Sequence, residues 1–407
     1  KNQFHEEKIE ELERAAKKDP KDFWKILRTS SDDIETNTNN NKNIPSNSEW
    51  LSHFQNLHSE HKINKEQEEI VKNLKNNENS KHKFTELDEI ITDNELYNAA
   101  KTIKTKKATY SDKIKNEMIK SSIDILIKGF SKVFNIILKS GIFPTFWCEG
   151  LITPIYKSGN SYDPNNYRGI CVSSCLGKFL CMVLNARLMA FSKSKNLIHP
   201  SQIGFTPGNR TADHILTFKI LHDKYIKHEN NKKMYACFVD FKKAFDSIWH
   251  EGLFYKLLQN EIGGNFYDLI KNLYSNTKCA IKLSDHRTPF FSYQRGVRQG
   301  CTLSPILFNI YINELPKLLD QTDSDPFILP NGTAISSLLY ADDLIILSRS
   351  RYGLQNSLNQ LNEWSKKWLM EINLKKTKIM IFEKYNTKKP KPNFFIGNNL
   401  VTQAKEY

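Results

Sequence analysis

The segment MYACFVDFKKAFDSIWH, residues 234–250, opens as a continuous apolar run and carries a carboxylate, Asp240, where that run ends. Short apolar runs of this kind are typical of strands buried on both faces. A carboxylate at the end of a buried strand is held at the edge of a sheet, where desolvation is costly unless a cation meets it. This segment therefore predicts a sheet that presents an acidic group to a ligand.

The segment SSLLYADDLIILS, residues 336–348, consists of two further apolar runs that flank the adjacent pair Asp342 and Asp343. The pattern predicts a hairpin with both carboxylates at its tip. Two like charges about 4 Å apart repel by about 4 kcal/mol at an effective dielectric constant of about 20, so a partly buried pair requires a cation. Hard oxygen ligands with few His or Cys nearby favour Mg²⁺, or Mn²⁺, over zinc.

Two interpretations of this acidic pair are open. Asp is common in turns, so the pair alone is explained equally well as a polar two-residue turn. Its apolar flanks, together with Asp240 at the end of another strand, favour a two-metal phosphoryl-transfer site. In such a site one metal binds the attacking hydroxyl and the other binds the leaving phosphate.

Between the carboxylates lies a glycine-rich stretch, QRGVRQGCTLSPILFNIYINEL, residues 294–315. Its glycines predict a loop that opens a helix, with Gly296, Gln299 and Gly300 in the loop and Leu303, Leu307, Tyr311 and Leu315 on one helical face. A helix N-terminus with Arg295 and Arg298 beside it suits a phosphate or a base edge. The alternative is a helix cap with incidental glycines. The order of carboxylate strand, glycine-rich helix start and double-carboxylate hairpin favours the functional interpretation.

The composition fits a folded protein that binds a polyanion. The 407 residues include 59 Lys and Arg against 45 Asp and Glu, which gives a net charge of +14. With 39% hydrophobic and 11% aromatic residues a disordered basic tail is excluded, and the length excludes a mini-protein. Short strand-like runs, such as residues 151–155, alternate with segments of helical period, which predicts an α+β or α/β core.

The cysteines do not indicate a disulfide scaffold, because seven in a chain this long are few and odd in number. The cluster Cys171, Cys175 and Cys181 lacks metal-ligand spacing, so buried thiols in a reducing compartment are favoured over a zinc site. No apolar run reaches the ~18 residues of a membrane span and the N-terminus has no signal-peptide pattern, so we expect neither membrane insertion nor secretion. Because the chain does not begin with Met, we expect it to be part of a longer protein.

The N-terminal part predicts a solvated helix over residues 3–17 and a flexible Asn-rich linker over residues 30–48. Thr92 and Glu95 form a capping box ahead of a further helix. The Lys-rich stretch that follows, residues 101–120, is either an ordinary solvated face or part of a nucleic-acid interface.

Three motifs, taken in order, resemble motifs A, B and C of reverse transcriptases, in the form found in non-LTR (LINE-type) retrotransposons. They are DFKKAFD at 240–246, GVRQGCTLSP at 296–305 and YADD at 340–343. The resemblance extends to fingers motifs at 151–157 and 166–170, to the segment before motif A at 202–211, and to motif D at 354–378. It covers about residues 85–385.

The resemblance implies an α+β fold, the fingers and palm of a right-hand polymerase, with an antiparallel palm sheet backed by helices and the thumb missing from this sequence. The implied regions are an N-terminal helix and linker at 1–48, a helical extension at 49–84, fingers at 85–230, palm at 231–385 and the start of a connection to the thumb at 386–407. The implied activity is RNA-directed DNA synthesis in transposition, with an RNA template, a DNA primer, dNTP and two Mg²⁺ ions. The implied location is the nucleus and cytoplasm, without a membrane. A thumb and an endonuclease are expected elsewhere in the parent polypeptide.

The resemblance also implies roles for individual residues. Asp240 and Asp342 would bind both metal ions, Asp343 would complete the carboxylate cluster, and the backbone carbonyl of Phe241 would be a further ligand. Lys157 and Arg168 would neutralise the triphosphate. Gln299 and Gly300 would pack against the nucleotide and template, and Phe245 would be a steric gate against the ribose 2′-hydroxyl. Lys376 would donate a proton to pyrophosphate, a role for which Lys375 and Lys378 compete. Template or primer contacts are implied for Arg210, Arg298 and Tyr340.

The chain departs from the family pattern at two fingers positions. Residues 108–113 (ATYSDK) keep only the Asp of the usual Pro-Gly-x-Asp-Gly turn, and Gly169 stands where Pro is usual. One alternative to the polymerase is therefore a catalytically silent or domesticated nucleic-acid-binding protein. The other is an RNA-dependent RNA polymerase, because Asp240 and Asp246 fit its motif A, although Phe245 and the YADD motif argue against it. The basic stretches 101–120 and 375–391 are expected to hold the template and primer.

Overall fold

The computed structural model of the protein describes residues 44–80, 86–227, 233–283, 286–329, 331–384 and 392–404. Several sequence predictions fall outside the described residues. They are the helix over 3–17, most of the linker over 30–48, residues 385–391 of the basic stretch 375–391, and parts of the connection at 386–407.

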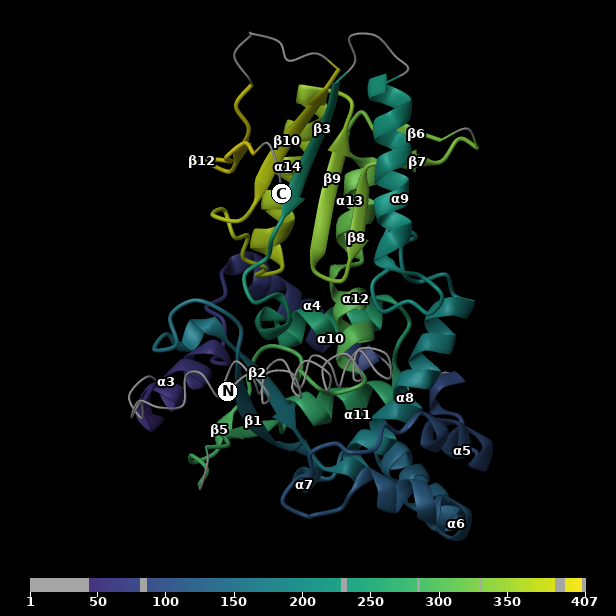
Figure 1. Ribbon diagram of the computed structural model, residues 1–407. Coiled ribbons are helices and arrows are strands. Elements are labelled where there is room, and N and C mark those ends of the chain that lie inside the picture. Colours follow the sequence, from purple (N-terminus) through teal and green to yellow (C-terminus); the bar gives the residue numbers. More distant parts are fainter. Residues whose placement is uncertain are drawn as a thin grey trace, which may run out of the picture.

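An antiparallel sheet of four strands, in the order β10-β3-β9-β8, forms the upper half of the molecule in Figure 1. The strands are β3 (Lys233–Val239), β8 (Ser337–Tyr340), β9 (Asp343–Ser348) and β10 (Lys378–Glu383). Val239 pairs with Leu344 and Tyr340 pairs with Asp343, so the end of β3 meets the tip of the β8–β9 hairpin. The strands and the hairpin predicted from the apolar runs around Asp240 and Asp342 are confirmed.

Both faces of this sheet are buried, because successive residues of β3 point to opposite sides. Met234 and Ala236 pack in one cluster with residues of α9 (Thr211–His222) and of the π-helical turn Asp223–Lys227. Cys237 and Val239 belong to the main core, to which α14 (Arg351–Lys367) contributes Leu354, Leu358 and Leu361. The predicted antiparallel sheet backed by helices is therefore confirmed.

A second sheet, in the order β2-β1-β4-β5, lies in the lower half of the molecule (Figure 1). Its strands are β1 (Glu149–Tyr156), β2 (Tyr167–Val172), β4 (Lys278–Ile281) and β5 (Phe291–Ser292). β1 pairs antiparallel with β2 but parallel with β4, which follows β3 in the chain. β4 and β5, from residues after 230, thus complete the sheet that β1 and β2 begin, and the division of the chain at residue 230 stays a prediction.

The lower half of the molecule also contains the helices α5 (Asp93–Thr102), α6 (Asn116–Ser140), α7 (Thr145–Cys148), α8 (Cys175–Ser194) and α11 (Gly264–Ser275), of which α7 contacts β1 (Figure 1). The predicted capping box starts α5, because the Glu95 carboxylate accepts from the Thr92 N–H at 2.8 Å and the Thr92 hydroxyl accepts from the Glu95 N–H at 3.3 Å. Within the described ranges, α8 is the one helix with the length and composition to cross a membrane. Since 56% of its most apolar 18-residue stretch is buried inside the protein, α8 has the burial of a core helix.

The helix predicted after the glycine-rich loop is divided into α12 (Ser304–Ile312) and α13 (Glu314–Gln321). The division falls at Asn313, whose side chain donates to the Leu197 carbonyl at 2.6 Å and accepts from the His199 N–H at 2.7 Å. Leu315 therefore lies on α13 and does not share a helix with Leu303. Residues 306–312 are all buried, so α12 is surrounded by core instead of presenting one apolar face.

The remaining elements are α3 (Asn47–Leu57), α4 (Lys65–Ser80), α10 (His250–Gln259), the hairpin β6 (Phe327–Ile328) with β7 (Ala334–Ile335), the hairpin β11 (Phe395–Ile396) with β12 (Asn399–Leu400), and short 3₁₀ turns at Glu86–Asp88, Pro164–Asn166 and Ala244–Ser247. α3 contacts the fingers at β4 and at the turn Pro164–Asn166, whereas α4 packs against α10. The segment 47–80 therefore lies against both halves of the molecule.

Candidate active site

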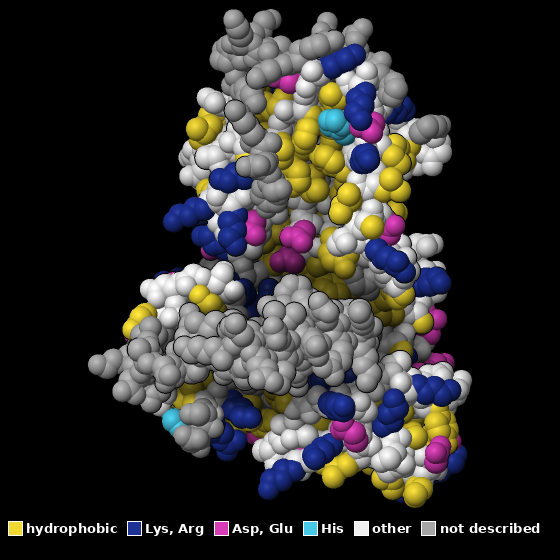
Figure 2. Space-filling model, in the orientation of Figure 1, with side chains coloured by type: hydrophobic (Ala, Val, Ile, Leu, Met, Phe, Trp, Pro, Cys, Tyr) yellow, Lys and Arg dark blue, Asp and Glu magenta, His cyan; other side chains and the backbone are white. Residues whose placement is uncertain are grey.

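A cleft of about 830 Å³ lies where β3 ends and the β8–β9 hairpin turns. Most of the predicted site residues line it: Asp240, Phe241, Phe245, Asp342, Lys157, Arg168, Gln299, Gly300 and Lys376. Figure 2 shows acidic side chains in the hollow between the two halves, with Lys and Arg side chains around it. The palm supplies carboxylates and the fingers supply cations to one space.

Asp240 follows the last residue of β3 and is held by the segment that precedes β10. Its Oδ2 accepts from Asn373 Nδ2 at 2.8 Å, and its backbone carbonyl accepts from the Asn373 N–H at 2.7 Å. The Asp240 N–H donates to Thr377 Oγ1 at 3.2 Å. Asn373 therefore fixes the orientation of a carboxylate that the strand end alone would leave free to rotate.

Asp342 lies at the tip of the β8–β9 hairpin, next to a strained residue. Ala341 has a φ of +57°, a conformation that favours Gly. The buried side chain of Gln202 accepts from the Ala341 N–H at 2.9 Å and donates to the Ala341 carbonyl at 3.0 Å. Gly204 lies so close that a Cβ there would be 2.1 Å from the Ala341 nitrogen. Gln202 and Gly204 thus hold the backbone that positions Asp342.

The electrostatics of the carboxylates call for a cation. Burial, and then the neighbouring Asp240, raise the pKa of Asp342, and burial followed by Asp342 and Asp240 raises the pKa of Asp343. Asp343, at the first position of β9, keeps much of its side-chain surface in solvent although neighbouring atoms crowd its carboxylate, and it does not line the cleft. Among the described residues, four carboxylates line the cleft. Asp246 accepts from Gln299 and Glu371 pairs with Lys242, so Asp240 and Asp342 are the two that lie at the strand end and the hairpin tip.

The donor set fits a hard divalent ion. Across the described part of the chain, no three Asp, Glu, His or Cys side chains form a ready-made metal site. Mg²⁺ in phosphoryl-transfer sites is bound by one or two carboxylates and completed by water and substrate phosphates. Asp240 and Asp342 match that requirement, so an incoming phosphate would complete the site.

Two cations of the fingers line the same cleft. Lys157 directly follows β1, and Arg168 lies on β2 opposite Ile155. Burial, and then the charge of Arg168, lower the pKa of Lys157, whereas Asp246 and Asp342 act in the opposite direction. Lys157 is only partly surrounded by protein, and both side chains keep enough exposed surface to bind a polyanion in the cleft.

Three lysines compete for a role in the segment after α14. Lys376 lines the cleft. Lys378 lies on β10 and donates to Thr402 Oγ1 at 2.6 Å, and Lys375 does not line the cleft. Position therefore favours Lys376.

Phe245 is fixed in the cleft wall by two other rings. Its ring stacks on Phe308 with centroids 4.3 Å apart and 13° between the planes, and Phe205 approaches edge-on at 6.0 Å. A ring held in this way resists displacement by a bulkier ligand.

Gln299 and Gly300 lie in the loop before α12. Gln299 Nε2 donates to Asp246 Oδ1 at 2.7 Å, and the Gln299 carbonyl accepts from the Cys171 N–H at 2.8 Å. Gly300 has a φ of +116°, and a Cβ there would lie 2.8 Å from the Cys171 carbonyl oxygen. Burial raises the pKa of Asp246 to about 6. The loop is thus fixed to both the palm and the fingers.

Two arginines predicted to lie beside phosphates are bound elsewhere. Arg298, the predicted template or primer contact, is 2% exposed and donates to the carbonyls of Trp147 and Cys148 at 3.2 and 3.3 Å. That prediction is wrong, because the guanidinium is buried in the core. Arg295 lines the cleft, but its guanidinium binds the end of α3. Arg210 is exposed before α9 and Tyr340 ends β8; neither lines the cleft, and their roles stay predictions.

Sequence reasoning assigned no role to Gln202, Gly204 or Asn373, which position the two carboxylates. Gln202 contacts Ala341, 139 residues away, and Asn373 contacts Asp240, 133 residues away. The available signal was indirect, because all three lie in segments that carry the family resemblance outside motifs A to C.

A sequence profile of the family described as Reverse transcriptase (RNA-dependent DNA polymerase) matches residues 155–400. The RNA-directed DNA polymerase from mobile element jockey of Drosophila funebris is 28% identical over 326 residues, which cover 78% of this chain and 34% of that protein. The retrovirus-related Pol polyprotein from type-1 retrotransposable element R2 of Popillia japonica is 31% identical over 247 residues, 59% of this chain and 33% of that protein. The chain spans about a third of the length of these relatives.

Among solved structures, an apo telomerase from Candida tropicalis, truncated from its C-terminal domain, has a TM-score of 0.44 and 18% identity, covering 64% of this chain and 57% of that chain. The range matched by the family profile includes every residue that lines the cleft except Phe54 and Leu57 of α3.

Proposed function

The chain belongs to the reverse transcriptase family, and on that premise we propose that its cleft extends a DNA primer with dNTP along an RNA template. The observation that carries the proposal is the meeting of Asp240 and Asp342, from two strand ends, with Lys157 and Arg168 of the fingers in one cleft. Nucleotidyl transfer needs acidic ligands for divalent ions and basic groups for a triphosphate within the same space. The basic excess of +14 supports a nucleic-acid partner.

In the proposed reaction, the primer 3′-hydroxyl gives up its proton to solvent, its oxygen forms a bond to the α-phosphorus of the dNTP, and the bond from that phosphorus to pyrophosphate breaks. Asp240 and Asp342 would hold two Mg²⁺ ions, which supply charge stabilisation at the attacking and leaving oxygens. Lys157 and Arg168 orient the triphosphate and neutralise its charge. Lys376 donates a proton to the departing pyrophosphate.

The remaining cleft residues would select the nucleotide. Gln299, oriented by Asp246, and Gly300 form the surface on which the base pair packs. The ring of Phe245, fixed by Phe308, would occupy the volume that a ribose 2′-hydroxyl requires. This arrangement supports dNTP over rNTP as substrate and favours a DNA polymerase over an RNA polymerase.

Transposition, action in the nucleus and cytoplasm, and a thumb and endonuclease elsewhere in the parent polypeptide are further parts of the proposal. The relatives' names support the first, since they come from mobile elements. The seven cysteines, all free and buried, are consistent with a reducing compartment.

The test is Asp342→Asn in a primer-extension assay with an RNA template and Mg²⁺. We expect dNTP incorporation to fall at least about 100-fold, because a neutral amide is a poor Mg²⁺ ligand. The matched control is Asp124→Asn, which removes an exposed carboxylate on α6 and should leave incorporation unchanged.

Undiminished incorporation by Asp342→Asn would refute the assignment of the site. A wild-type chain that binds primer and template without extending the primer would support the catalytically silent alternative. Preference for rNTP over dNTP would support the RNA polymerase instead.

A further inference from the structure

The last two residues of α3 and the four that follow, Asn56–His61, contact the loop that leads into Gln299 and Gly300. We name this segment the α3 clamp. It lies outside the range matched by the family profile, residues 155–400, so family membership alone assigns it no role. Its contacts converge on Arg295, which also lines the cleft.

The Arg295 guanidinium binds the C-terminal end of α3. Its Nε donates to the Leu57 carbonyl at 2.6 Å, and its Nη2 donates to the Asn56 carbonyl at 3.1 Å. Carbonyls at the end of a helix lack intrahelical partners and attract cations. The last turn of α3 contains no basic residue, so Arg295 supplies this cation from another part of the chain.

Two histidines of the clamp reinforce the contact. The buried His58 ring stacks on Tyr293 with centroids 3.8 Å apart, and His58 Nδ1 lies 3.1 Å from the Arg295 carbonyl. Burial lowers the pKa of His58 to about 3, so this ring is neutral and Nδ1 donates its proton. The His58 carbonyl in turn accepts from the Gln294 N–H at 2.9 Å.

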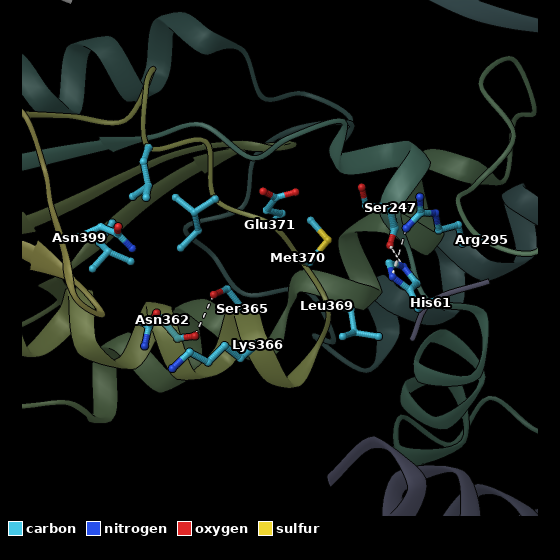
Figure 3. A pocket seen from close by; sticks show the side chains of 13 residues that line it. His61, Ser247, Arg295, Asn362, Ser365, Lys366, Leu369, Met370, Glu371 and Asn399 are labelled. Atoms are coloured by element: carbon cyan, nitrogen blue, oxygen red, sulfur yellow. Dashed lines mark hydrogen bonds between the residues drawn. The ribbon is translucent and has the colours of Figure 1, made fainter. Parts of the chain in front are cut away.

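His61 links Arg295 to the turn after Phe245, as Figure 3 shows at one end of a neighbouring pocket. Arg295 Nη1 lies 3.3 Å from His61 Nδ1, and His61 Nε2 lies 2.9 Å from the Ser247 carbonyl. Both bonds form in the tautomer that carries its proton on Nε2, because an arginine can only donate. A neutral His61 therefore joins Arg295 and Ser247, which both line the cleft, to the clamp.

The residues on either side of the clamp are bound to the rest of the protein. In α3, Phe54 covers Gly169 of β2, where a Cβ would lie 2.6 Å from the Phe54 ring, so Gly at this position makes room for the helix. After the clamp, the Gln67 amide donates to the carbonyls of Lys366 and Lys367, each at 3.1 Å. The end of α3 that Arg295 binds is therefore held in place on both sides.

Backbone hydrogen bonds hold the loop between Arg295 and the proposed nucleotide site. The Gly296 N–H donates to the Ile248 carbonyl and the Val297 N–H to the Phe245 carbonyl, both at 2.8 Å. Gln299 then binds Asp246. A shift at Arg295 would therefore strain the bonds of Gly296 and Val297 to this turn and, through them, the position of Gln299, four residues on.

We propose that Arg295 is a positioning residue for nucleotide binding, through which the α3 clamp fixes Gln299 and Gly300 at the site of the incoming dNTP. This inference rests on the proposed function. It makes the segment before the family-matched range a part of the nucleotide site, acting through Arg295 and without contact to the reacting atoms.

The test compares Arg295→Gln with Arg187→Gln in the full chain. Arg187 is the matched control, because its guanidinium also donates to carbonyls of a distant segment, those of Leu87 and Ile90 at 3.1 and 2.9 Å, and binds Glu95. Unlike Arg295, Arg187 does not line the cleft. We expect both variants to lower the unfolding midpoint. Arg295→Gln alone should raise the KM for dNTP, by about tenfold, with a smaller change in kcat and unchanged affinity for primer and template.

His61→Ala and His58→Phe provide graded variants that do not depend on Arg295→Gln folding. His58→Phe keeps the stack on Tyr293 and loses one hydrogen bond, so its KM for dNTP should rise less than that of His61→Ala. Equal KM values for dNTP in wild type, Arg295→Gln and His61→Ala would overturn the inference while leaving the proposed function intact. A wild-type chain without dNTP incorporation would overturn both.

Discussion

Replacing Gln202 by Leu should remove the support of the hairpin tip that carries Asp342. The buried Gln202 side chain accepts from the N–H groups of Ala341 and Gly204 at 2.9 and 2.8 Å and donates to the Ala341 carbonyl at 3.0 Å. Leu would leave these three backbone groups without partners. Since a buried polar group left unpaired costs about 1–3 kcal/mol, and relaxation recovers part of this cost, we expect the free energy of unfolding to fall by about 3 kcal/mol.

The effect on catalysis should exceed the effect on stability. Ala341 occupies a conformation that costs a non-glycine residue about 1–2 kcal/mol, and Gln202 is the side chain that holds it there. Without Gln202 the turn relaxes and Asp342 moves. A displacement of about 1 Å at a reacting centre costs about 100-fold in rate, so we expect that loss in kcat among the molecules that remain folded.

The control is Gln67→Leu, which also removes a buried Gln with three bonds, to the Asn64 N–H and to the carbonyls of Lys366 and Lys367. Urea unfolding measures stability and primer extension at saturating dNTP measures kcat. Adding Ala341→Gly to Gln202→Leu should recover about 1 kcal/mol. If Gln202→Leu lowers kcat no more than Gln67→Leu does, the reasoning about the hairpin is refuted.

Two further predictions concern the cleft wall. Phe245→Ala should reduce the preference for dNTP over rNTP by about tenfold or more, measured as the ratio of kcat/KM values, because Ala removes the ring that stacks on Phe308 and leaves its volume open to a 2′-hydroxyl; an unchanged ratio contradicts the steric role. Asp246→Asn should flatten the dependence of stability on pH. Burial raises the Asp246 pKa from 3.8 to about 6, so the wild type loses stability as pH rises from about 4 to about 6, whereas the neutral amide does not titrate. Urea unfolding should find the variant more stable by about 3 kcal/mol at pH 7 and about equal at pH 4; parallel pH profiles would contradict the prediction.

The sheet that carries the carboxylates was predictable from the sequence because its signals are local. The apolar runs before Asp240 and around Asp342 have strand composition, and their order along the chain matches the family motifs. A strand can be recognised from a run of a few apolar residues or from their alternation, without knowledge of contacts to distant parts of the chain.

The supports of the site were not predictable, because they depend on contacts across long separations in the chain. Arg298 has the local setting of a phosphate ligand beside a helix start, yet its partners are carbonyls about 150 residues away. The bond from Arg295 to Leu57 spans 238 residues. Both arginines were interpreted from their neighbours in the sequence, whereas their roles follow from the packing of α3 and α7 on the loop.

The parallel pairing of β1 with β4 has a consequence for biosynthesis. β1 and β2 emerge from the ribosome before β3, but one edge of β1 stays unpaired until residues 278–281 have been made. Pairings between distant segments form slowly and leave strand edges open to wrong partners in the meantime. We therefore expect a nascent chain that stops at residue 230 to bind chaperones or aggregate, and the fingers and palm to fold as one cooperative unit.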